Sequence, residues 1–331
     1  MALYNANLFS GGSGSAIACP LGKLVADGGV SESTLPYSFN AGSTVVFNNE
    51  IHIIGSGDSS YRTNHYKFDG SSWSYVSTLP YNFYYGCAVV YNNEIHIMGG
   101  EGGTTKHYKW NGSSWSSVST LPYEFSMSSA VVYNNEIHIL GSYVNSYKKY
   151  HYKWNGSSWS SVSTLDYDFY NGCAVVLNGE IHRLGGSSYT LMHSKWNGSE
   201  WSVVGSLPYD FYQSSAVVYN DEIHILGSKN SSYYTKHYKF NGTSWESVST
   251  LPYNFCYGRS VAYNKFIHIL GGSNGATNHY SLKSGTFLIG YAKKDTDIYY
   301  PISSTAITDN LTATTDGYKV TEDGKVEIMN T

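Results

Sequence analysis

One unit is repeated six times along this chain. When the copies are aligned on the Tyr that follows a Leu-Pro or Leu-Asp pair, they are 44, 42, 44, 42 and 44 residues apart. The aligning residues are Tyr37, Tyr81, Tyr123, Tyr167, Tyr209 and Tyr253. Odd copies carry a longer loop than even ones, so the duplicated unit is about 86 residues long and occurs three times. A repeat of this period indicates an array whose core forms only between neighbouring copies.

Each copy contains two β-hairpins. In the second copy, "AVVY" and "EIHIM" flank a two-residue "NN" turn, and "KHYKW" and "WSSVS" flank an "NGSS" turn. Asn-rich two-residue links are typical of tight hairpins, and period-two alternation is typical of strands. Four short antiparallel strands in every 42 to 44 residues, without helical periodicity, predict a β-propeller blade. We therefore expect an all-β protein, a six-bladed β-propeller with blades beginning near residues 37, 81, 123, 167, 209 and 253.

The strand pairs also carry a recognisable motif. Even copies end their second strand in a Gly doublet, followed by a Tyr and then a Trp: "IHIMGG" at 95–100, "IHRLGG" at 181–186 and "IHILGG" at 267–272. This pattern resembles the kelch repeat, although His stands where that family usually has an aromatic residue. In odd copies the second Gly is replaced by Ser56, Ser142 or Ser228. The resemblance covers residues 37 to about 282 and implies a kelch-type propeller, a fold that serves enzymes, adaptors and lectin-like binders.

The ends of the repeat array suggest how the ring closes. The sixth copy lacks the "WNGSSW" hairpin, so its outer strand must come from elsewhere. We expect residues 24–34 to supply it, with 286–291 as the alternative. The predicted domains are an N-terminal arm (1–23), the propeller (24–291) and a C-terminal β extension (292–331). The last is too short for a core of its own, carries a hairpin signal at Asp323-Gly324, and is expected to dock on or attach to a partner.

The copies differ in two sets of loops that should share one face of the propeller. These are the links between blades and the links between the second and third strands of each blade. A rigid frame with variable loops is typical of a binding protein, and Tyr, Ser, Gly and Asn on such loops resemble an antibody paratope. The candidate ligand-binding residues are Tyr61, Arg62, Tyr84, Tyr85, Tyr143, Tyr147, Tyr170, Tyr189, Tyr212, Tyr233, Tyr234, Tyr257 and Arg259.

The histidines and cysteines are better explained by structure than by chemistry. All twelve histidines fall into two repeated positions, represented by His52 and His65 in the first copy. The first position alternates with Ile on a strand, so we expect it to lie between blades and to hydrogen-bond an acid such as Glu50 or Glu94. The four cysteines show no metal-ligand spacing and are expected to be free. We expect no catalytic residue, no metal and no cofactor, and we read the tryptophans as blade-packing residues.

Composition excludes several functions. Charged residues make up 13% of the chain, and the net charge of −4 has no basic cluster beside it, so nucleic acid is not an expected partner. No apolar run reaches membrane-spanning length, and the first residues lack the features of a signal peptide. We therefore expect synthesis in a cytoplasm without membrane insertion.

These features together suggest a function through resemblance. Near-identical, Tyr/Ser/Asn-rich kelch-like repeats resemble propellers among the tail proteins of bacteriophages and phage-like particles. The resemblance implies a receptor-binding protein of the virion, at a tail tip or fibre. It would be made in the host cytoplasm and attached through its termini to other tail or particle subunits. It would bind a surface glycan or cell-wall polymer. One alternative is a structural or adaptor propeller that binds a protein. A carbohydrate-active enzyme is the remaining alternative, although the repeats show no clustered acidic and basic groups.

Overall fold

The protein divides into two compact units. In the computed structural model, the described residues are 22–25, 30–144, 147–186, 190–248, 250–273, 276–282, 286–289, 291–294, 298–301, 318–320 and 326–328. One unit spans Asp27–Lys283, and the other combines Met1–Ala26 with Ser284–Thr331. No helix in the described part of the chain is both long enough and apolar enough to cross a membrane.

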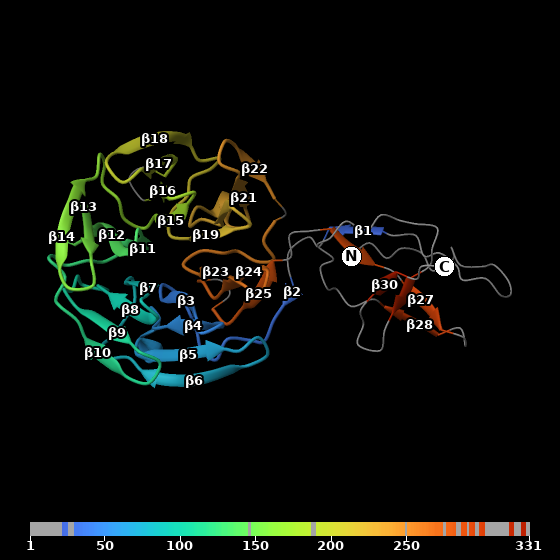
Figure 1. Ribbon diagram of the computed structural model, residues 1–331. Coiled ribbons are helices and arrows are strands. Elements are labelled where there is room, and N and C mark those ends of the chain that lie inside the picture. The colour runs from blue at the N-terminus through green and yellow to red at the C-terminus, as the bar shows by residue number, and fades with distance from the viewer. Residues whose placement is uncertain are drawn as a thin grey trace. The chain divides into compact units, whose positions relative to one another are not determined.

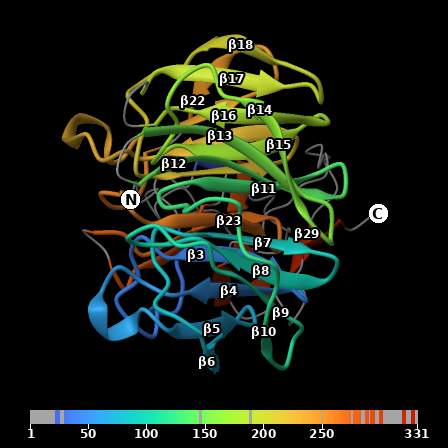
Figure 2. The same ribbon diagram turned by 90° about the vertical axis from the view of Figure 1, so that its left-hand side faces the viewer.

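The first unit is a six-bladed β-propeller in which each blade is a four-stranded antiparallel sheet (Figure 1). Five blades run outward from the axis in chain order. Blade one consists of β3 (Ser43–Phe47), β4 (Glu50–Ile54), β5 (Asn64–Phe68) and β6 (Trp73–Thr78). Blade two consists of β7 (Cys87–Tyr91), β8 (Glu94–Met98), β9 (His107–Trp110) and β10 (Trp115–Ser117). Blade three consists of β11 (Ser129–Tyr133), β12 (Glu136–Tyr143), β13 (Tyr147–Trp154) and β14 (Trp159–Thr164). Turned by 90°, Figure 2 shows the blades edge-on.

The second half of the ring repeats this arrangement. Blade four consists of β15 (Cys173–Leu177), β16 (Glu180–Leu184), β17 (Met192–Trp196) and β18 (Trp201–Ser206). Blade five consists of β19 (Ser215–Tyr219), β20 (Glu222–Leu226), β21 (His237–Phe240) and β22 (Trp245–Ser247). Blade six contributes β23 (Arg259–Tyr263), β24 (Phe266–Leu270) and β25 (His279–Leu282). Among the described residues, the helical segments are two short 3-10 turns in the long loops of blades one and five, η2 (Ser59–Tyr61) and η3 (Ser231–Tyr233).

The N-terminal side of the chain closes the ring. The strand β2 (Val30–Ser31) pairs antiparallel with β25 and is the fourth strand of blade six. The closing strand is thus much shorter than the expected segment 24–34. The alternative segment does not close the ring, because β26 (Thr286–Ile289) pairs with β1 (Gly22–Val25) in the other unit. The boundary of the propeller unit at Lys283 therefore falls before the expected one at 291.

The second unit contains two further antiparallel pairs. The strand β27 (Tyr291–Lys294) pairs with β28 (Ile298–Pro301), and β29 (Tyr318–Val320) pairs with β30 (Val326–Ile328). The latter pair flanks the Asp323-Gly324 position that the sequence marked as a hairpin, while the turn itself lies outside the described residues.

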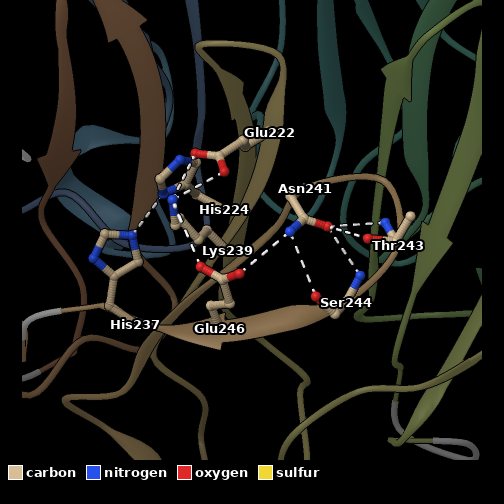
Figure 3. Close-up of polar contacts among 8 residues, drawn as sticks. All are labelled: Glu222, His224, His237, Lys239, Asn241, Thr243, Ser244 and Glu246. Atoms are coloured by element: carbon tan, nitrogen blue, oxygen red, sulfur yellow. Dashed lines mark hydrogen bonds and ion pairs between the residues drawn. The ribbon is translucent and has the colours of Figure 1, made fainter.

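The hairpin turns form as their residues predict. Both turn residues of the first hairpin have positive φ, 50° at Asn48 and 59° at Asn49, which a tight type I′ hairpin requires. In the second hairpins an Asn or Asp side chain holds the turn: Asn241 Oδ1 accepts from the backbone N–H groups of Thr243 and Ser244, both at 3.0 Å (Figure 3). These turns account for the repeated "NGSS" sequences without a ligand.

The core lies between blades. Residues of the inner strands of one blade, such as Val45 and Phe47, form one cluster with Tyr81, Phe83 and the strands of the next blade. The Phe two positions after each aligning Tyr is fully buried in all six copies. Burial of an aromatic side chain of this size stabilises by roughly 2–3 kcal/mol relative to exposure. The ring is therefore held together by six equivalent interfaces.

The histidines form six buried pairs within the blades. Nδ1 of His52 lies 2.8 Å from Nε2 of His65, and every blade repeats this contact at 2.8 or 2.9 Å; Figure 3 shows the pair of blade five. The expectation of a Glu partner is wrong, because Glu50 instead forms an ion pair with Lys67. Burial lowers the pKa of His52 to about 4 and that of His65 to about 3, so both rings are neutral.

Candidate functional site at the propeller axis

A ring of six backbone hydrogen bonds surrounds the propeller axis. Its members stand four positions after each aligning Tyr, and each donates its N–H to the carbonyl of the preceding member at 2.7 or 2.8 Å. The ring closes because Ala41 donates to Tyr257 at 2.8 Å. We call this set the axis ring: Ala41, Tyr85, Met127, Asn171, Gln213 and Tyr257. The sequence alignment places these residues in one register but does not reveal that they bond to each other.

The axis ring holds its residues in an unfavourable backbone conformation. All six have φ between 50° and 59°, a region that costs a residue with a side chain about 1–2 kcal/mol. Gly occupies such positions without that cost, yet none of the six is Gly. The six side chains are therefore presented from one shared backbone geometry, and they differ in size and polarity.

A second ring begins the innermost strands, two residues further along. We call it the strand-start ring: Ser43, Cys87, Ser129, Cys173, Ser215 and Arg259. Odd blades have Ser, and blades two and four have Cys. In the odd blades the Ser hydroxyls bridge to the following blade: Ser43 donates to the carbonyl of Gly86 at 3.0 Å, and Ser129 accepts from the N–H of Ala174 at 2.9 Å. Blade six departs from this pattern with Arg259.

All residues of the two rings except Ala41 line one cavity, and every blade contributes residues to it. Its volume is about 170 Å³. One water needs only about 10–15 Å³ by this kind of measure, whereas pockets for drug-sized ligands begin near 300 Å³. The cavity is therefore suited to one small chemical unit, such as the end of a polymer.

The mouth of the cavity is chemically divided. Tyr85 and Tyr257, on either side of the small Ala41, bring their ring centroids to 6.4 Å with the planes at 61°. The other half of the axis ring presents a thioether and two amides, from Met127, Asn171 and Gln213. One side thus offers aromatic faces, and the other offers amide hydrogen-bonding groups.

Two cations lie beside the aromatic half. Nζ of Lys229, in the long loop of blade five, is 5.3 Å from the centre of the Tyr257 ring. A side-chain hydrogen bond with Tyr257 raises the pKa of Lys229, so its ammonium remains charged. Arg259 lines the cavity itself and donates from Nη1 to the carbonyl of Gly258 at 2.9 Å. This corner of the site is positively charged.

The thiols of the strand-start ring are protonated. Desolvation raises the pKa of Cys87 and of Cys173 to about 11, despite the nearby Arg259 guanidinium. A thiol is a nucleophile or a metal ligand only as its thiolate, so these groups line the cavity as neutral side chains. Cys87, Cys173 and Cys256 are free. Among the described residues, no three His, Cys, Asp or Glu side chains converge as a metal site needs.

The structure brings together only some of the residues singled out from the sequence. Tyr85, Tyr257 and Arg259 line the cavity. Tyr84 is buried, its ring centre lies 5.4 Å from that of Tyr85 with the planes tilted by 45°, and the guanidinium of Arg62 lies 4.2 Å from the Tyr84 ring centre. These five residues form one continuous group that leads from the cavity to the loop of blade one.

Other predicted residues lie outside this group. The ring centre of Tyr61 lies 5.3 Å from that of Tyr37, and the ring centre of Tyr233 lies 5.4 Å from that of Tyr209. Each of these tyrosines therefore packs its long loop against its own blade. The remaining described side chains are only partly covered or exposed: Tyr143, Tyr170, Tyr212 and Tyr234.

Tyr143 and Tyr170 form a separate aromatic pair, stacked at 5.1 Å, with Tyr143 45% exposed. Tyr147 pairs with Tyr143 through the strand backbone, and Tyr189 lies outside the described residues.

Sequence reasoning missed the non-aromatic half of the site. Met127, Asn171 and Gln213 occupy the same register as Tyr85 and Tyr257, so comparing this position across the copies would have found them. Lys229 and the two thiols carry no such signal, because their placement depends on which loops meet around the axis.

Blade four contains a second unusual arginine, which has a structural explanation. Arg183 is 0% exposed and stands where the other blades have Ile. It forms an ion pair with Asp166, which replaces the Pro of the other copies. It also donates to Ser194, which replaces a Tyr, at 2.9 Å. Its guanidinium lies 3.7 Å from the centre of the Tyr167 ring. Three replacements therefore accommodate one buried charge inside the blade.

Fold and site together place the protein in the class of six-bladed β-propellers with a cavity at the axis. A search against protein-family models and a search of curated proteins each found no match. Solved structures do match, among them the structure of YjhT, with a TM-score of 0.65 and 16% sequence identity over 82% of this chain and 99% of that one. At this identity the likeness concerns the fold alone. The propeller architecture is thus supported independently of the kelch-like motif.

Proposed function

We propose that this protein is a non-enzymatic binding module that recognises a bacterial surface glycan through the mouth of the axial cavity. One observation carries the proposal. Five of the six positions in the axis ring, which share one backbone geometry fixed by the ring of hydrogen bonds, present four different side-chain types to one small cavity. A frame that is held constant while its side chains vary is the arrangement of a recognition site.

The chemistry of the mouth suits a sugar. Tyr85 and Tyr257 supply aromatic faces that can cover the apolar C–H surface of a sugar ring. Asn171 and Gln213 supply amides that donate and accept hydrogen bonds with hydroxyl groups. The lining formed by the described residues contains no Asp, Glu or His and its thiols are protonated, so these residues offer binding groups rather than an acid–base pair.

A glycan-binding propeller with a separate terminal unit also suggests a place in a larger assembly. We propose that the protein is a tail-tip or fibre component of a phage or phage-like particle. The N- and C-terminal segments belong to one compact unit and the binding site to the other, so the terminal unit would attach to other subunits. A protein partner at the loop face is the main alternative, and the same binding experiment separates it from a glycan.

The test is binding of the purified protein to a glycan array and to intact bacteria. We expect saturable binding that Tyr85→Ala and Tyr257→Ala each weaken by about 10-fold or more, since loss of a stacked aromatic contact costs roughly 1–3 kcal/mol. Tyr75→Ala is the matched control, because Tyr75 is 56% exposed on the outer strand β6. Absence of binding to every glycan and cell by the folded protein would refute the proposal. Equal weakening by all three variants would refute the placement of the site.

A further inference from the structure

Arg259 is the one charged residue lining the axial cavity, within the part of the chain that the structure describes. It begins β23, at a position where the other five blades carry Ser or Cys. Five blades keep a small polar residue at this position, and the sixth carries a guanidinium. This replacement introduces a charge into an otherwise neutral cavity. The structural role of the strand-start ring does not explain the replacement, because the Ser residues of this ring bridge blades without any charge.

The described part of the chain supplies no countercharge to Arg259. Among the described residues, no Asp or Glu lies within ion-pair distance of Arg259, whereas Arg62 pairs with Glu101 and Arg183 with Asp166. The blade-loop residues outside the description, at 145–146, 187–189, 249 and 274–275, contain no Asp or Glu, whereas the segment 26–29 before the closing strand contains Asp27. Cys87 and Cys173 interact electrostatically with the guanidinium. Both thiols are protonated, so they carry no charge.

The guanidinium also retains unused hydrogen-bonding capacity. It has five N–H donors, and the described protein groups accept from it at one atom, the carbonyl of Gly258. Desolvation lowers the pKa of Arg259, so its surroundings oppose the charged form. A desolvated cation with free donors is stabilised when an anion binds to it, because the anion supplies both the countercharge and the missing acceptors.

Lys229 extends the positive region toward the rim. Its Nζ lies 5.3 Å from the centre of the Tyr257 ring, and Lys229 does not line the cavity, whereas Arg259, two residues after Tyr257, does. The aromatic pair of Tyr85 and Tyr257 therefore has one cation beside it and another in the cavity lining. A ligand whose ring stacks on these tyrosines would place an anionic substituent within reach of Arg259.

We propose that the cavity is an oxyanion site and that the ligand is an acidic sugar unit, whose carboxylate binds Arg259 while its ring contacts Tyr85 and Tyr257. This assignment rests on the proposed glycan-binding function and specifies its ligand. A planar carboxylate matches the guanidinium fork and accepts two parallel hydrogen bonds.

The experiment compares sugars that differ only in the group at C6, which is a carboxylate, an amide or a hydroxymethyl group. D-Glucuronate, D-glucuronamide and D-glucose are titrated by calorimetry into the full-length protein, into Arg259→Ser and into Arg62→Ser. Arg259→Ser introduces the residue that the odd blades carry at this position, so it preserves the repeat. An unchanged far-UV circular dichroism spectrum would show that this variant is folded. Arg62→Ser is the control for a loop cation outside the cavity.

We expect glucuronate to bind at least 10-fold more tightly than the two neutral sugars, in a salt-dependent manner. Arg259→Ser should remove this preference, with a loss of about 10- to 100-fold, as expected for a charge-assisted hydrogen bond. Arg62→Ser should retain it. Equal affinity for glucuronate and glucose, or a preference that survives in Arg259→Ser, would overturn the acidic-sugar assignment while leaving glycan binding intact.

A second measurement separates the anion from the sugar. Thermal unfolding is followed in acetate, phosphate and sulfate at constant ionic strength. Stabilisation by acetate that disappears in Arg259→Ser supports the oxyanion site. If in addition no glycan on the array binds, only the proposed glycan-binding function fails. Stabilisation by phosphate or sulfate without acetate or glucuronate binding would identify a free inorganic anion as the ligand and overturn the sugar assignment.

Discussion

The six buried histidine pairs predict acid unfolding at an unusually high pH. In the native protein, burial holds the pKa of the first His of each pair at about 4 and that of the second at about 3. In the unfolded chain each titrates near 6.5. The native state therefore binds fewer protons, so stability is fully present above pH 6.5 and is lost progressively as the pH falls toward 4.

The magnitude follows from the pKa differences. At pH 5 an unfolded His is almost fully protonated and a native one is almost neutral, which costs about 2 kcal/mol per residue. Twelve histidines sum to roughly 25 kcal/mol, more than the ~5–15 kcal/mol that stabilises a typical domain. Since each pair also shares one hydrogen bond, protonation of both rings would place two donors face to face. We expect the propeller to unfold between about pH 5 and 6.

The assay is urea unfolding followed by Trp fluorescence from pH 8 to pH 5. The free energy of unfolding should fall with a slope near pH 5.5 that corresponds to uptake of about eleven protons. The double variant His52→Gln with His65→Gln keeps hydrogen-bonding groups in blade one but removes two titrating sites, and should lower this number by about two. Asp69 does not produce this effect, because hydrogen bonds with Ser72 and Ser71 lower its pKa to about 2, so that its contribution is lost only at lower pH. A free energy of unfolding that stays level between pH 7 and 5.5 would refute the reasoning.

Two further predictions concern the frame of the propeller. A Cβ at Gly55 would lie 1.9 Å from the Phe83 carbonyl oxygen of the next blade, so Gly55→Ala should destabilise by about 3 kcal/mol in urea unfolding. Gly102→Ala, which has a similar φ and no neighbour within 4 Å, should cost only about 1 kcal/mol, and equal losses would contradict the proposed close approach. The buried charge of blade four should be replaceable: Arg183→Ile together with the consensus residues Pro at 166 and Tyr at 194 should unfold at the same or a higher urea concentration. Arg183→Ile alone should be less stable than the triple variant, and the reverse order would contradict the accommodation of one charge by three replacements.

Periodicity in the sequence predicted most of the fold. The strands, the Asn turns and the number of blades each depend on residues within one copy, and alternation and turn chemistry act over a few residues. The closing strand could not be located to the residue from the sequence. Val30–Ser31 is only two residues long, and it forms a strand because it pairs with the free edge of β25. The partner of His52 was assigned to the wrong residue. A Glu two positions earlier on the same strand is the nearer choice in sequence, but strand pairing brings the His of the neighbouring strand to 2.8 Å.

The candidate site was predictable only in part. Tyr85, Tyr257 and Arg259 attracted attention because they interrupt a repeat, and they do line the cavity. The same criterion also selected Tyr61 and Tyr233, which pack against the tyrosines of their own blades. A difference between copies shows that a position tolerates change, but not whether the side chain there faces the axis or a neighbouring ring.

The sequence by itself determined a six-bladed all-β ring, because the unit, its turns and its apolar alternation are local features repeated six times. Only the tertiary structure decided where the ring becomes asymmetric. Closing six blades around an axis brings residues more than 40 positions apart into one cycle of hydrogen bonds, with Ala41 donating to Tyr257 across the closure. It also places Arg259 in one cavity with two neutral thiols, without a carboxylate partner among the described residues. Side chains meet there because of ring geometry, which no single copy encodes, so the chemistry of the site exists only once the last blade is in place.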